Sequence, residues 1–260
     1  MKEEKKMNYP DFGLKNKIAI VTGGNKGIGK GTALCLANAG SDVIVAGRTQ
    51  SELEQVASEI EKMGRKSLPV VMDVTRKQSV DSMVHQALMK FGRIDVLVNS
   101  AGVSEVLPPE EYPEEVWDKI IDTNLKGVFL CCQSVGKAMI KQKSGVIINI
   151  SSQAGSVALP NHAAYCASKG GVNLLTKVLA LDWAQYNIRV NAVGPTVINT
   201  PMADQIFGDP EVRAETMKKI PIGHFGDVED VAGAVIFLAS DASKMITGHI
   251  LLVDGGWTIQ

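Results

Sequence analysis

Short apolar segments alternate with longer amphipathic segments along almost the whole chain, and this alternation constrains the fold more than any other feature. The apolar segments are rich in Val and Ile without polar alternation, which is typical of strands covered on both faces. They occupy 17–22, 42–47, 68–72, 94–99, 145–150, 188–193 and 249–254. The helix-like segments occupy 27–39, 50–63, 76–91, 113–140, 162–186 and 228–240. Joined by right-handed crossovers, these elements predict an α/β fold with a doubly wound, mainly seven-stranded parallel sheet and helices on both faces.

No linker, repeat or low-complexity tract interrupts the 260 residues, so we expect a single domain over residues 14–260. Residues 1–13 are charged and have no apolar stretch, which predicts a flexible lead and not a secretory signal. The stretch 195–226 is the main irregular insertion. We expect it to contain a short helix and to act as a mobile substrate lid.

Charge, hydropathy and cysteine content exclude several classes of partner. Lys and Arg number 27 against 28 Asp and Glu, without a basic arm or face, so we expect no nucleic-acid partner. No run of about 18 apolar residues occurs, which predicts no membrane span. The four cysteines lack metal-ligand spacing, and the four histidines are scattered. We therefore expect a cytoplasmic protein with reduced thiols and no metal.

A glycine-rich turn follows the first predicted strand and opens the first predicted helix. Gly23 permits a tight turn, and Gly27 and Gly29 permit close approach of a phosphate and close contact between helix and turn. Backbone N–H groups at the helix start then face a pyrophosphate. The spacing is TGxxxGxG, and its position between strand and helix is what a Rossmann-type dinucleotide site requires.

The end of the second strand distinguishes NAD from NADP. An acidic residue there would accept hydrogen bonds from the ribose 2′-hydroxyl, but this chain has Arg48 and Thr49. Arg48 can hold a 2′-phosphate through two donors, and Lys26 supplies a second positive charge. Two bases and no acid predict NADP(H). The alternative is that both are solvated surface residues.

Further along, two turns after strands are expected to line the cofactor. Asp73 is placed to receive the adenine amino group; its alternative role is a helix N-cap, for which Thr75 is the better candidate. Small residues after the fourth strand would let the cofactor pass close to the sheet. The predicted cofactor set is Gly23, Asn25, Lys26, Gly27, Ile28, Gly29, Arg48, Thr49, Asp73, Val74, Asn99, Ala101 and Gly102.

Tyr165 and Lys169 lie four residues apart in a predicted helix and therefore share one face. A nearby ammonium stabilises a phenolate, so we expect Lys169 to lower the pKa of Tyr165 and to make the pair an acid/base. Ser152 follows the preceding strand at its carboxyl end, where ligands bind in such sheets, and Ser151 is its rival. Asn124 is a further candidate site residue. The alternative is that it is only a helical amide that is hydrogen-bonded to the backbone.

In order and spacing these motifs resemble the short-chain dehydrogenase/reductase family from Lys15 to Trp257. The matching motifs are Thr22-Gly23, Gly27-Ile28-Gly29, Asn99-Ser100-Ala101-Gly102, Asn124, Ser152, Tyr165-Cys166-Ala167-Ser168-Lys169 and Asp254-Gly255-Gly256. The resemblance implies that Asn124 holds a water in a proton relay and Ser152 positions the carbonyl. It implies that Tyr165 donates the proton and that Lys169, beside it, binds the nicotinamide ribose. Ile198 and Thr200 are implied to neighbour the carboxamide.

Two positions depart from the commonest family pattern: NSAG stands for NNAG, and Pro195-Thr196 for Pro-Gly, which we expect to stiffen that turn. The Pro-Thr variant resembles L-xylulose reductases, which reduce small ketoses and α-dicarbonyls with NADPH, and bacterial polyol and sugar-acid dehydrogenases. By that resemblance Gln153, His162 and Phe207 line the substrate pocket with Ser152. The alternatives are a helix-start residue for His162 and lid contacts for Phe207.

Two other functions stay open. A 3-oxoacyl carrier-protein reductase docks an acidic carrier and favours basic residues at the site, whereas the resembling positions here are Lys137, Leu181 and Asp182. A non-catalytic NADP-binding protein would keep the fold without turnover. By family analogy we expect a homotetramer built through helices 113–140 and 162–186, with 248–260 near another subunit.

Overall fold

The computed structural model describes residues 9–260, and residues 1–8 of the predicted flexible lead lie outside the described residues. Residues 9–13 form no helix or strand, and the Leu14 side chain that follows them is fully buried. The ring of Phe12 lies 6.3 Å from that of Phe237. Contact with the domain therefore begins within the predicted lead.

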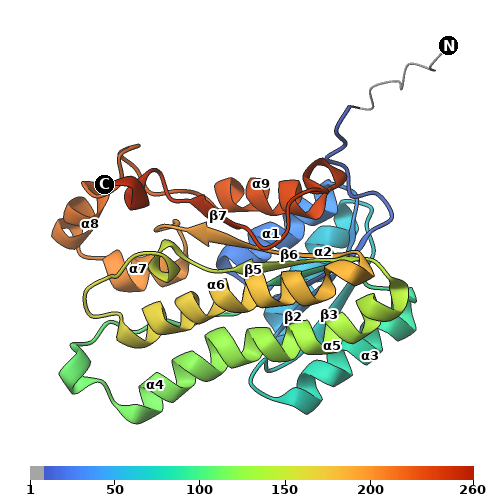
Figure 1. The fold of residues 1–260 in the computed structure, drawn as a ribbon, viewed down its shortest axis with the longest axis horizontal. Coiled ribbons are helices and arrows are strands. Elements are labelled where there is room, and N and C mark those ends of the chain that lie inside the picture. Colours follow the sequence, from blue (N-terminus) through green and yellow to red (C-terminus); the bar gives the residue numbers. More distant parts are fainter. Residues whose placement is uncertain (1–8) are drawn as a thin grey trace.

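All seven predicted strands are present and form one parallel sheet in the order β3-β2-β1-β4-β5-β6-β7 (Figure 1). Their bounds are β1 (Ile18–Thr22), β2 (Asp42–Gly47), β3 (Ser67–Val71), β4 (Val96–Asn99), β5 (Gly145–Ile150), β6 (Ile188–Pro195) and β7 (Ile250–Val253). Because β1 pairs with β2 on one side and β4 on the other, the winding direction reverses there. The predicted doubly wound sheet is confirmed, and its ligand-binding switch point lies at the carboxyl ends of β1 and β4.

Helices cover both faces of the sheet, as predicted (Figure 1). One face carries α1 (Gly27–Asn38), α2 (Gln50–Lys62) and α9 (Val228–Ala239); the other carries α3 (Lys77–Phe91), α5 (Gly127–Gln142) and α6 (Ala163–Trp183). Successive strand residues point to opposite faces, so Ile20 enters one core and Val21 the other. Because both faces of the sheet are buried under helices, successive residues of each strand are apolar. Within residues 9–260, no helix combines the length and apolar character that a membrane span requires.

The segment predicted as one helix over 113–140 consists of three parts. After α4 (Glu114–Ile121) comes a π-helical turn over Asp122–Lys126, and α5 follows it directly. Such turns are rare in proteins as a whole, and those that occur are often found at functional sites. Asn124 lies within this turn and is fully buried, so the irregularity places the predicted relay residue inside the protein.

The stretch 195–226 contains the predicted short helix and a second one, α7 (Pro201–Phe207) and α8 (Pro210–Met217). Its role as a mobile lid stays a prediction. Each helix begins with proline, whose missing N–H and fixed φ suit the first helical position. Thr200 and Asp209 cap these two helices through their side chains. Two complete start signals within ten residues therefore produce two helices.

Candidate active site

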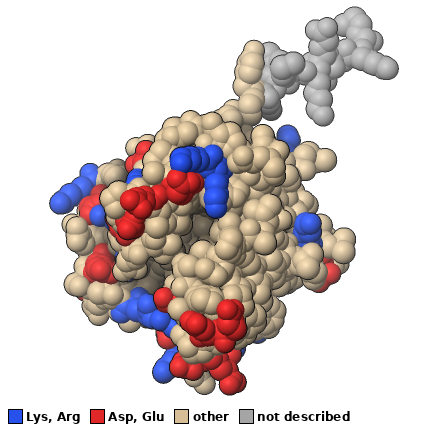
Figure 2. Space-filling view, turned by 90° about the vertical axis from the view of Figure 1, so that its left-hand side faces the viewer, with Lys and Arg blue, Asp and Glu red and all other residues tan. Residues whose placement is uncertain are grey.

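The carboxyl ends of β1 and β4 lie side by side and bring two predicted cofactor segments into contact. Gly23 has a φ of 66°, and a Cβ on it would lie 2.8 Å from Ala101 Cα. Thr22 Oγ1 accepts hydrogen bonds from the N–H groups of Ser100 and Ala101, at 3.1 and 3.3 Å. The glycine turn and the NSAG turn therefore form one surface. The carboxyl edge of the sheet faces the viewer in Figure 2, where the molecule is hollowed between acidic and basic side chains.

The start of α1 has the backbone geometry that a pyrophosphate requires. A Cβ on Gly29 would lie 2.1 Å from Gly23 O, so only glycine lets the helix lie this close to the turn. Gly27 has a φ of 52°, and Ile28 packs partly buried against the core. Lys26 at the N-cap makes no side-chain cap, and the first turn has no acidic side chain. The N–H groups at the positive end of the helix dipole are thus available to a dinucleotide phosphate.

Basic and acidic side chains meet at the end of β2. Arg48 and Lys26 are both exposed, so both side chains are accessible to a phosphate group that arrives from solvent. Asn25 Nδ2 donates a 2.6 Å hydrogen bond to Glu52 Oε2, and Asn25 Oδ1 lies 2.8 Å from where a Cβ on Gly47 would stand. No acid follows the end of β2 directly, as stated from the sequence, but the fold brings Glu52 of α2 to the glycine turn.

Asp73 closes a local turn after β3. Its Oδ1 accepts hydrogen bonds from the Thr75 N–H and hydroxyl, at 2.9 and 2.8 Å. The N-cap of α3 is Arg76, without a side-chain hydrogen bond, so the prediction that Thr75 caps this helix is wrong. Burial acts to raise the pKa of Asp73, but the bonds from Thr75 and the charges of Arg48 and Arg76 lower the pKa overall. Val74, next to it, is buried.

The Asn99 side chain points into the core. Its Nδ2 donates to Asn149 Oδ1 at 2.8 Å and contacts Cys132 Sγ at 3.3 Å, while Asn149 Nδ2 donates to Thr176 Oγ1 at 2.9 Å. This buried network joins β4 and β5 to α5 and α6. The side chain of Asn99 is therefore engaged within the protein, and the turn after it, which contains Gly102, faces the site.

Asn124 uses its amide to join three segments. Its Oδ1 accepts from Val103 N at 2.9 Å, and its Nδ2 donates to Val103 O at 2.8 Å and to Ser168 Oγ at 3.2 Å. The structural alternative, an amide bonded to backbone, is thus present. Its Oδ1 also lies 3.4 Å from the Cβ position of Gly102, so Asn124 ties the NSAG turn to α6. The relay role stays a prediction.

Tyr165 and Lys169 are brought together, but their electrostatics differ from expectation. Lys169 Nζ lies 5.6 Å from the Tyr165 ring centroid and donates a 2.8 Å hydrogen bond to Ile150 O. Burial lowers the pKa of Lys169 to about 8. Burial also raises the pKa of Tyr165, outweighing a hydrogen bond with Ser152 that acts to lower it. The expected lowering by Lys169 is wrong here, because desolvation of the phenolate dominates.

The two candidate serines point in different directions. Ser151 Oγ donates to Asn173 Oδ1 at 2.6 Å, deep against α6. Ser152 Oγ accepts from Ala154 N at 3.1 Å and donates to Pro195 O at 3.4 Å, and it acts to lower the pKa of Tyr165. The geometry therefore leaves Ser152, and not Ser151, on the side of Tyr165; the contact of Ser152 with the substrate oxygen, implied by the family resemblance, stays a prediction.

Polar groups flank the Ser152–Tyr165 pair. The Gln153 side chain is only 2% exposed, and among residues 9–260 its Oε1 has no hydrogen-bond partner; the same holds for Thr196 Oγ1. The His162 ring lies edge-on to the Tyr165 ring at 6.3 Å, and its Nδ1 lies 2.6 Å from Pro160 O. Burying a hydrogen-bond acceptor without a partner costs free energy. Gln153 Oε1 is therefore suited to accept a hydrogen bond from a hydroxyl of a ligand.

Phe207 belongs to a small apolar cluster within the lid. Its ring lies 5.9 Å from that of Phe225, and the cluster also includes Val197, Ala203 and Ile220. The alternative role of Phe207, contacts within the lid, is therefore present. Ile198 is buried, and the Thr200 side chain lies 3.6 Å from the Cβ position of Gly27. The start of the lid thus lies against the glycine turn.

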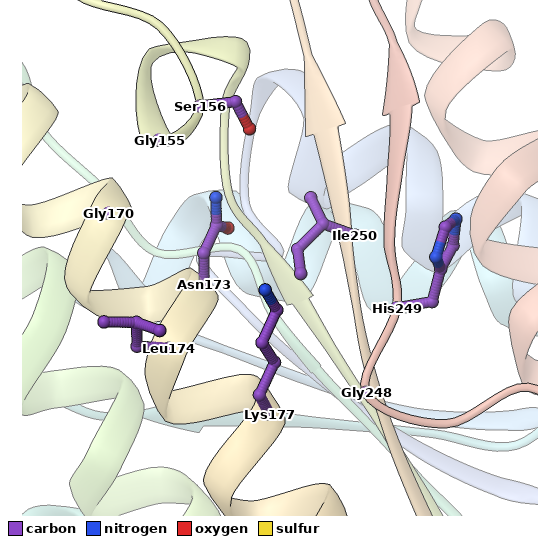
Figure 3. Close-up of a pocket in the computed structure, with 9 residues that line it drawn as sticks. All are labelled: Gly155, Ser156, Gly170, Asn173, Leu174, Lys177, Gly248, His249 and Ile250. Carbon is purple, nitrogen blue, oxygen red and sulfur yellow. The ribbon is translucent and has the colours of Figure 1, made fainter.

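A separate open pocket of about 550 Å³ lies between α6 and β7 (Figure 3). Asn173, Lys177 and Ile250 are among its lining residues, and none of the predicted catalytic residues is. Asn173 is also the partner of Ser151. Sequence reasoning did not single out this pocket, because it is formed by residues far apart in the chain.

The thiols and histidines form no evident reactive centre. All four cysteines are free, and burial raises the pKa of Cys132 to about 12, with Cys131 raised as well. Thiols with a raised pKa are poor nucleophiles. In the part of the chain that the structure describes, no three His, Cys, Asp or Glu side chains are grouped to hold a metal.

Two residues at the site were missed by sequence reasoning. Glu52 stands three residues after Thr49, the S/T-x-x-E spacing of a capping box, which would have drawn attention to it. Asn173 lies four residues after Lys169 and so on the same face of α6. Their partners, Asn25 and Ser151, lie more than 20 residues away, which no local pattern reveals.

Fold and site together define an oxidoreductase that uses a dinucleotide. The sequence profile described as enoyl-(acyl carrier protein) reductase matches residues 23–258. A solved gluconate 5-dehydrogenase from Burkholderia cenocepacia, in complex with NADP and tartrate, is 34% identical with a TM-score of 0.93. The alignment covers 96% of this chain and 98% of that one. The chain belongs to the short-chain dehydrogenase/reductase family.

Relatives of similar length carry several activities. The chain is 41% identical to the NAD-dependent glycerol dehydrogenase of Listeria innocua, over 96% of this chain and 97% of that one. It is 42% identical to the 3-oxoacyl-acyl-carrier-protein reductase of Thermotoga maritima, over 95% and 99%. It is 40% identical to the L-xylulose reductase of Mesocricetus auratus, over 96% and 99%. The family is therefore established, and its members differ in substrate and cofactor.

Proposed function

We propose that this protein transfers a hydride between NADP(H) and a small polyhydroxylated ketone or the matching polyol. The unpartnered, buried Oε1 of Gln153 beside Ser152 carries the proposal. A substrate with a hydroxyl next to its carbonyl supplies the donor that this oxygen lacks. Similarity to a glycerol dehydrogenase, an L-xylulose reductase and a gluconate 5-dehydrogenase supports this substrate class.

The proton chemistry follows from the environment of Tyr165. Its raised pKa keeps the phenol protonated at neutral pH, so it donates a proton to the carbonyl oxygen, which the Ser152 hydroxyl holds in place. Lys169 Nζ lies 5.6 Å from the centre of the ring that would carry the phenolate charge, so it offsets only part of the cost of burying that charge. Nicotinamide, when bound, supplies or accepts the hydride. The start of α1 and the NSAG turn would hold its dinucleotide.

NADP(H) is the proposed cofactor because Arg48 and Lys26 are exposed at the end of β2. A panel of L-xylulose, diacetyl, polyols and acetoacetyl thioesters, run with NADPH and NADH, tests both parts. We expect turnover of ketoses with NADPH, and Arg48→Asp to shift the preference toward NADH. Equal kcat/KM with both cofactors in the wild type would contradict the cofactor assignment.

A second candidate is 3-oxoacyl carrier-protein reduction, which the 42% identity to such an enzyme favours. An acidic carrier would meet exposed Leu181 and Asp182 on α6, and Lys137 on α5 is the one base among these positions. Asp182 repels an acidic partner, so the small-substrate proposal is preferred. Turnover of acetoacetyl thioesters without turnover of ketoses would reverse this choice.

We also propose that the protein is a homotetramer assembled through α5 and α6. Leu174, Val178 and Leu181 on α6 are 65%, 53% and 80% exposed, and Phe129 on α5 is 41% exposed. Adjacent apolar side chains of this size are typical of covered surfaces. Light scattering after size exclusion gives the mass; a monomer would contradict the assembly.

A further inference from the structure

The contact between Asn25 and Glu52 leads to an inference about cofactor choice, which rests on the proposed function. Glu52 is the third residue of α2, after Thr49 at the N-cap. A glutamate at this spacing usually returns to cap its own helix. Here Thr49 makes no side-chain cap, and the Glu52 carboxylate instead accepts the 2.6 Å hydrogen bond from Asn25 Nδ2.

This bond holds the Asn25 amide over the end of β2. A Cβ on Gly47 would lie 2.8 Å from Asn25 Oδ1, so a side chain at residue 47 would force the amide to shift from this position. The end of this strand is where doubly wound folds place the adenosine ribose and its 2′ group. Glu52 therefore brings a carboxylate to the ribose position from α2, although the strand end itself carries Arg48.

The charges around this position oppose each other. Within residues 9–260, neither Arg48 nor Lys26 forms an ion pair, and Glu52 forms none either. Lys26 directly follows Asn25, and Arg48 lies four residues before Glu52 in the chain, just outside α2. A 2′-phosphate is attracted by the two bases and repelled by the carboxylate. A 2′-hydroxyl is not repelled, and it can donate to the carboxylate.

We propose that Glu52 is a specificity-determining residue, whose carboxylate, held by Asn25, weakens binding of the 2′-phosphate of NADP(H) and sustains binding of NAD(H). Glu52 thus opposes the attraction of Arg48 and Lys26 for the 2′-phosphate. It reduces the ratio of NADPH affinity to NADH affinity. The partly exposed setting limits the repulsion to about a fivefold effect on affinity.

Binding measured without substrate tests this proposal. Titration of protein fluorescence with NADPH and NADH gives both dissociation constants for the wild type, Glu52→Gln and Glu59→Gln. Glu59 lies on the same helix, paired with Lys30 at 2.9 Å, so its variant loses the same charge away from the ribose position. We expect Glu52→Gln to bind NADPH about five times more tightly, with NADH affinity unchanged or weakened, and Glu59→Gln to keep the wild-type ratio.

Two further measurements, one at high salt and one on a charge-preserving variant, distinguish an electrostatic effect of Glu52 from a structural one. In about 1 M salt the gain of Glu52→Gln should shrink, because charges are screened within about 3 Å. Glu52→Asp keeps the charge and should stay near the wild-type ratio. Equal ratios for Glu52→Gln and Glu59→Gln, or a ratio for Glu52→Asp that matches Glu52→Gln, would overturn the proposal. A wild type that prefers NADH would contradict the proposed NADP(H) function alone, since the comparison of variants still stands.

Discussion

Lys169 places its ammonium 5.6 Å from the centre of the Tyr165 ring and donates a 2.8 Å hydrogen bond from the same ammonium to Ile150 O. The two residues share a face of α6, but the ammonium is aimed at the backbone of β5. Burial raises the pKa of Tyr165 and lowers the pKa of Lys169 to about 8. The phenol therefore keeps its proton at neutral pH, while the ammonium is near its titration point.

Replacing Tyr165 with Phe removes the proposed proton donor and leaves the ring in place. We expect kcat to fall at least about 100-fold, the usual loss when a positioned acid is removed. NADPH affinity should change by less than about threefold. Steady-state kinetics and fluorescence titration measure the two quantities. Unchanged turnover would show that another group supplies the proton, and this outcome also tests the non-catalytic alternative.

The buried ammonium of Lys169 makes stability depend on pH. Its pKa is about 8 in the folded state against the ordinary lysine value of 10.5, so between these limits the unfolded chain binds the additional proton. The free energy of unfolding should therefore rise with pH over this window, by up to about 3 kcal/mol from this group. Urea unfolding of the wild type from pH 7.5 to 10.5 measures it.

Lys169→Met provides the control for that pH dependence, because it keeps the length and apolar stem of the side chain. Other groups titrate in the same window, so the quantity to compare is the difference between the two proteins. We expect Lys169→Met to be the more stable protein near pH 7 and its advantage to shrink toward pH 10. An advantage that is constant with pH would show that Lys169 is not desolvated.

Gly29→Ala should destabilise the protein and weaken dinucleotide binding. The new Cβ would lie 2.1 Å from Gly23 O, which forces α1 away from the turn. We expect a loss of about 1–3 kcal/mol in the free energy of unfolding, as for other overpacked sites. Gly233→Ala on α9 is the matched control, since no atom lies within 4 Å of its Cβ position. It should be neutral or stabilising by up to about 1 kcal/mol.

Gln153→Leu should separate binding from stability. The buried Oε1 of Gln153 lacks a partner, so an apolar side chain of similar size should leave thermal stability unchanged or improve it. KM for a ketose should rise about tenfold, because a substrate hydroxyl loses its acceptor. KM for diacetyl, which has no hydroxyl, should change little. Equal effects on both substrates would place Gln153 outside the substrate pocket.

Local sequence patterns predicted the positions of the strands and of most helices. They did not predict where a helix is interrupted. Strand positions follow from short continuous apolar runs and helix positions from a period of about 3.6 residues, and a short window of sequence contains both signals. The π turn around Asn124 has no such signature, since it depends on the contacts of its amide with Val103 and Ser168. The sequence-based expectation includes no second helix in the stretch 195–226, although Asp209-Pro210 is a clear start signal.

By itself, the sequence determined the doubly wound sheet, the glycine turn at its switch point and the shared face of Tyr165 and Lys169. These features depend on spacing along the chain, which is local. Only the tertiary structure decided the pKa of Tyr165, the choice of Ser152 over Ser151 and the approach of Glu52 to Asn25. Burial and contacts between residues distant in sequence produce these properties, because desolvation and hydrogen bonding depend on the atoms that surround a group in the folded chain.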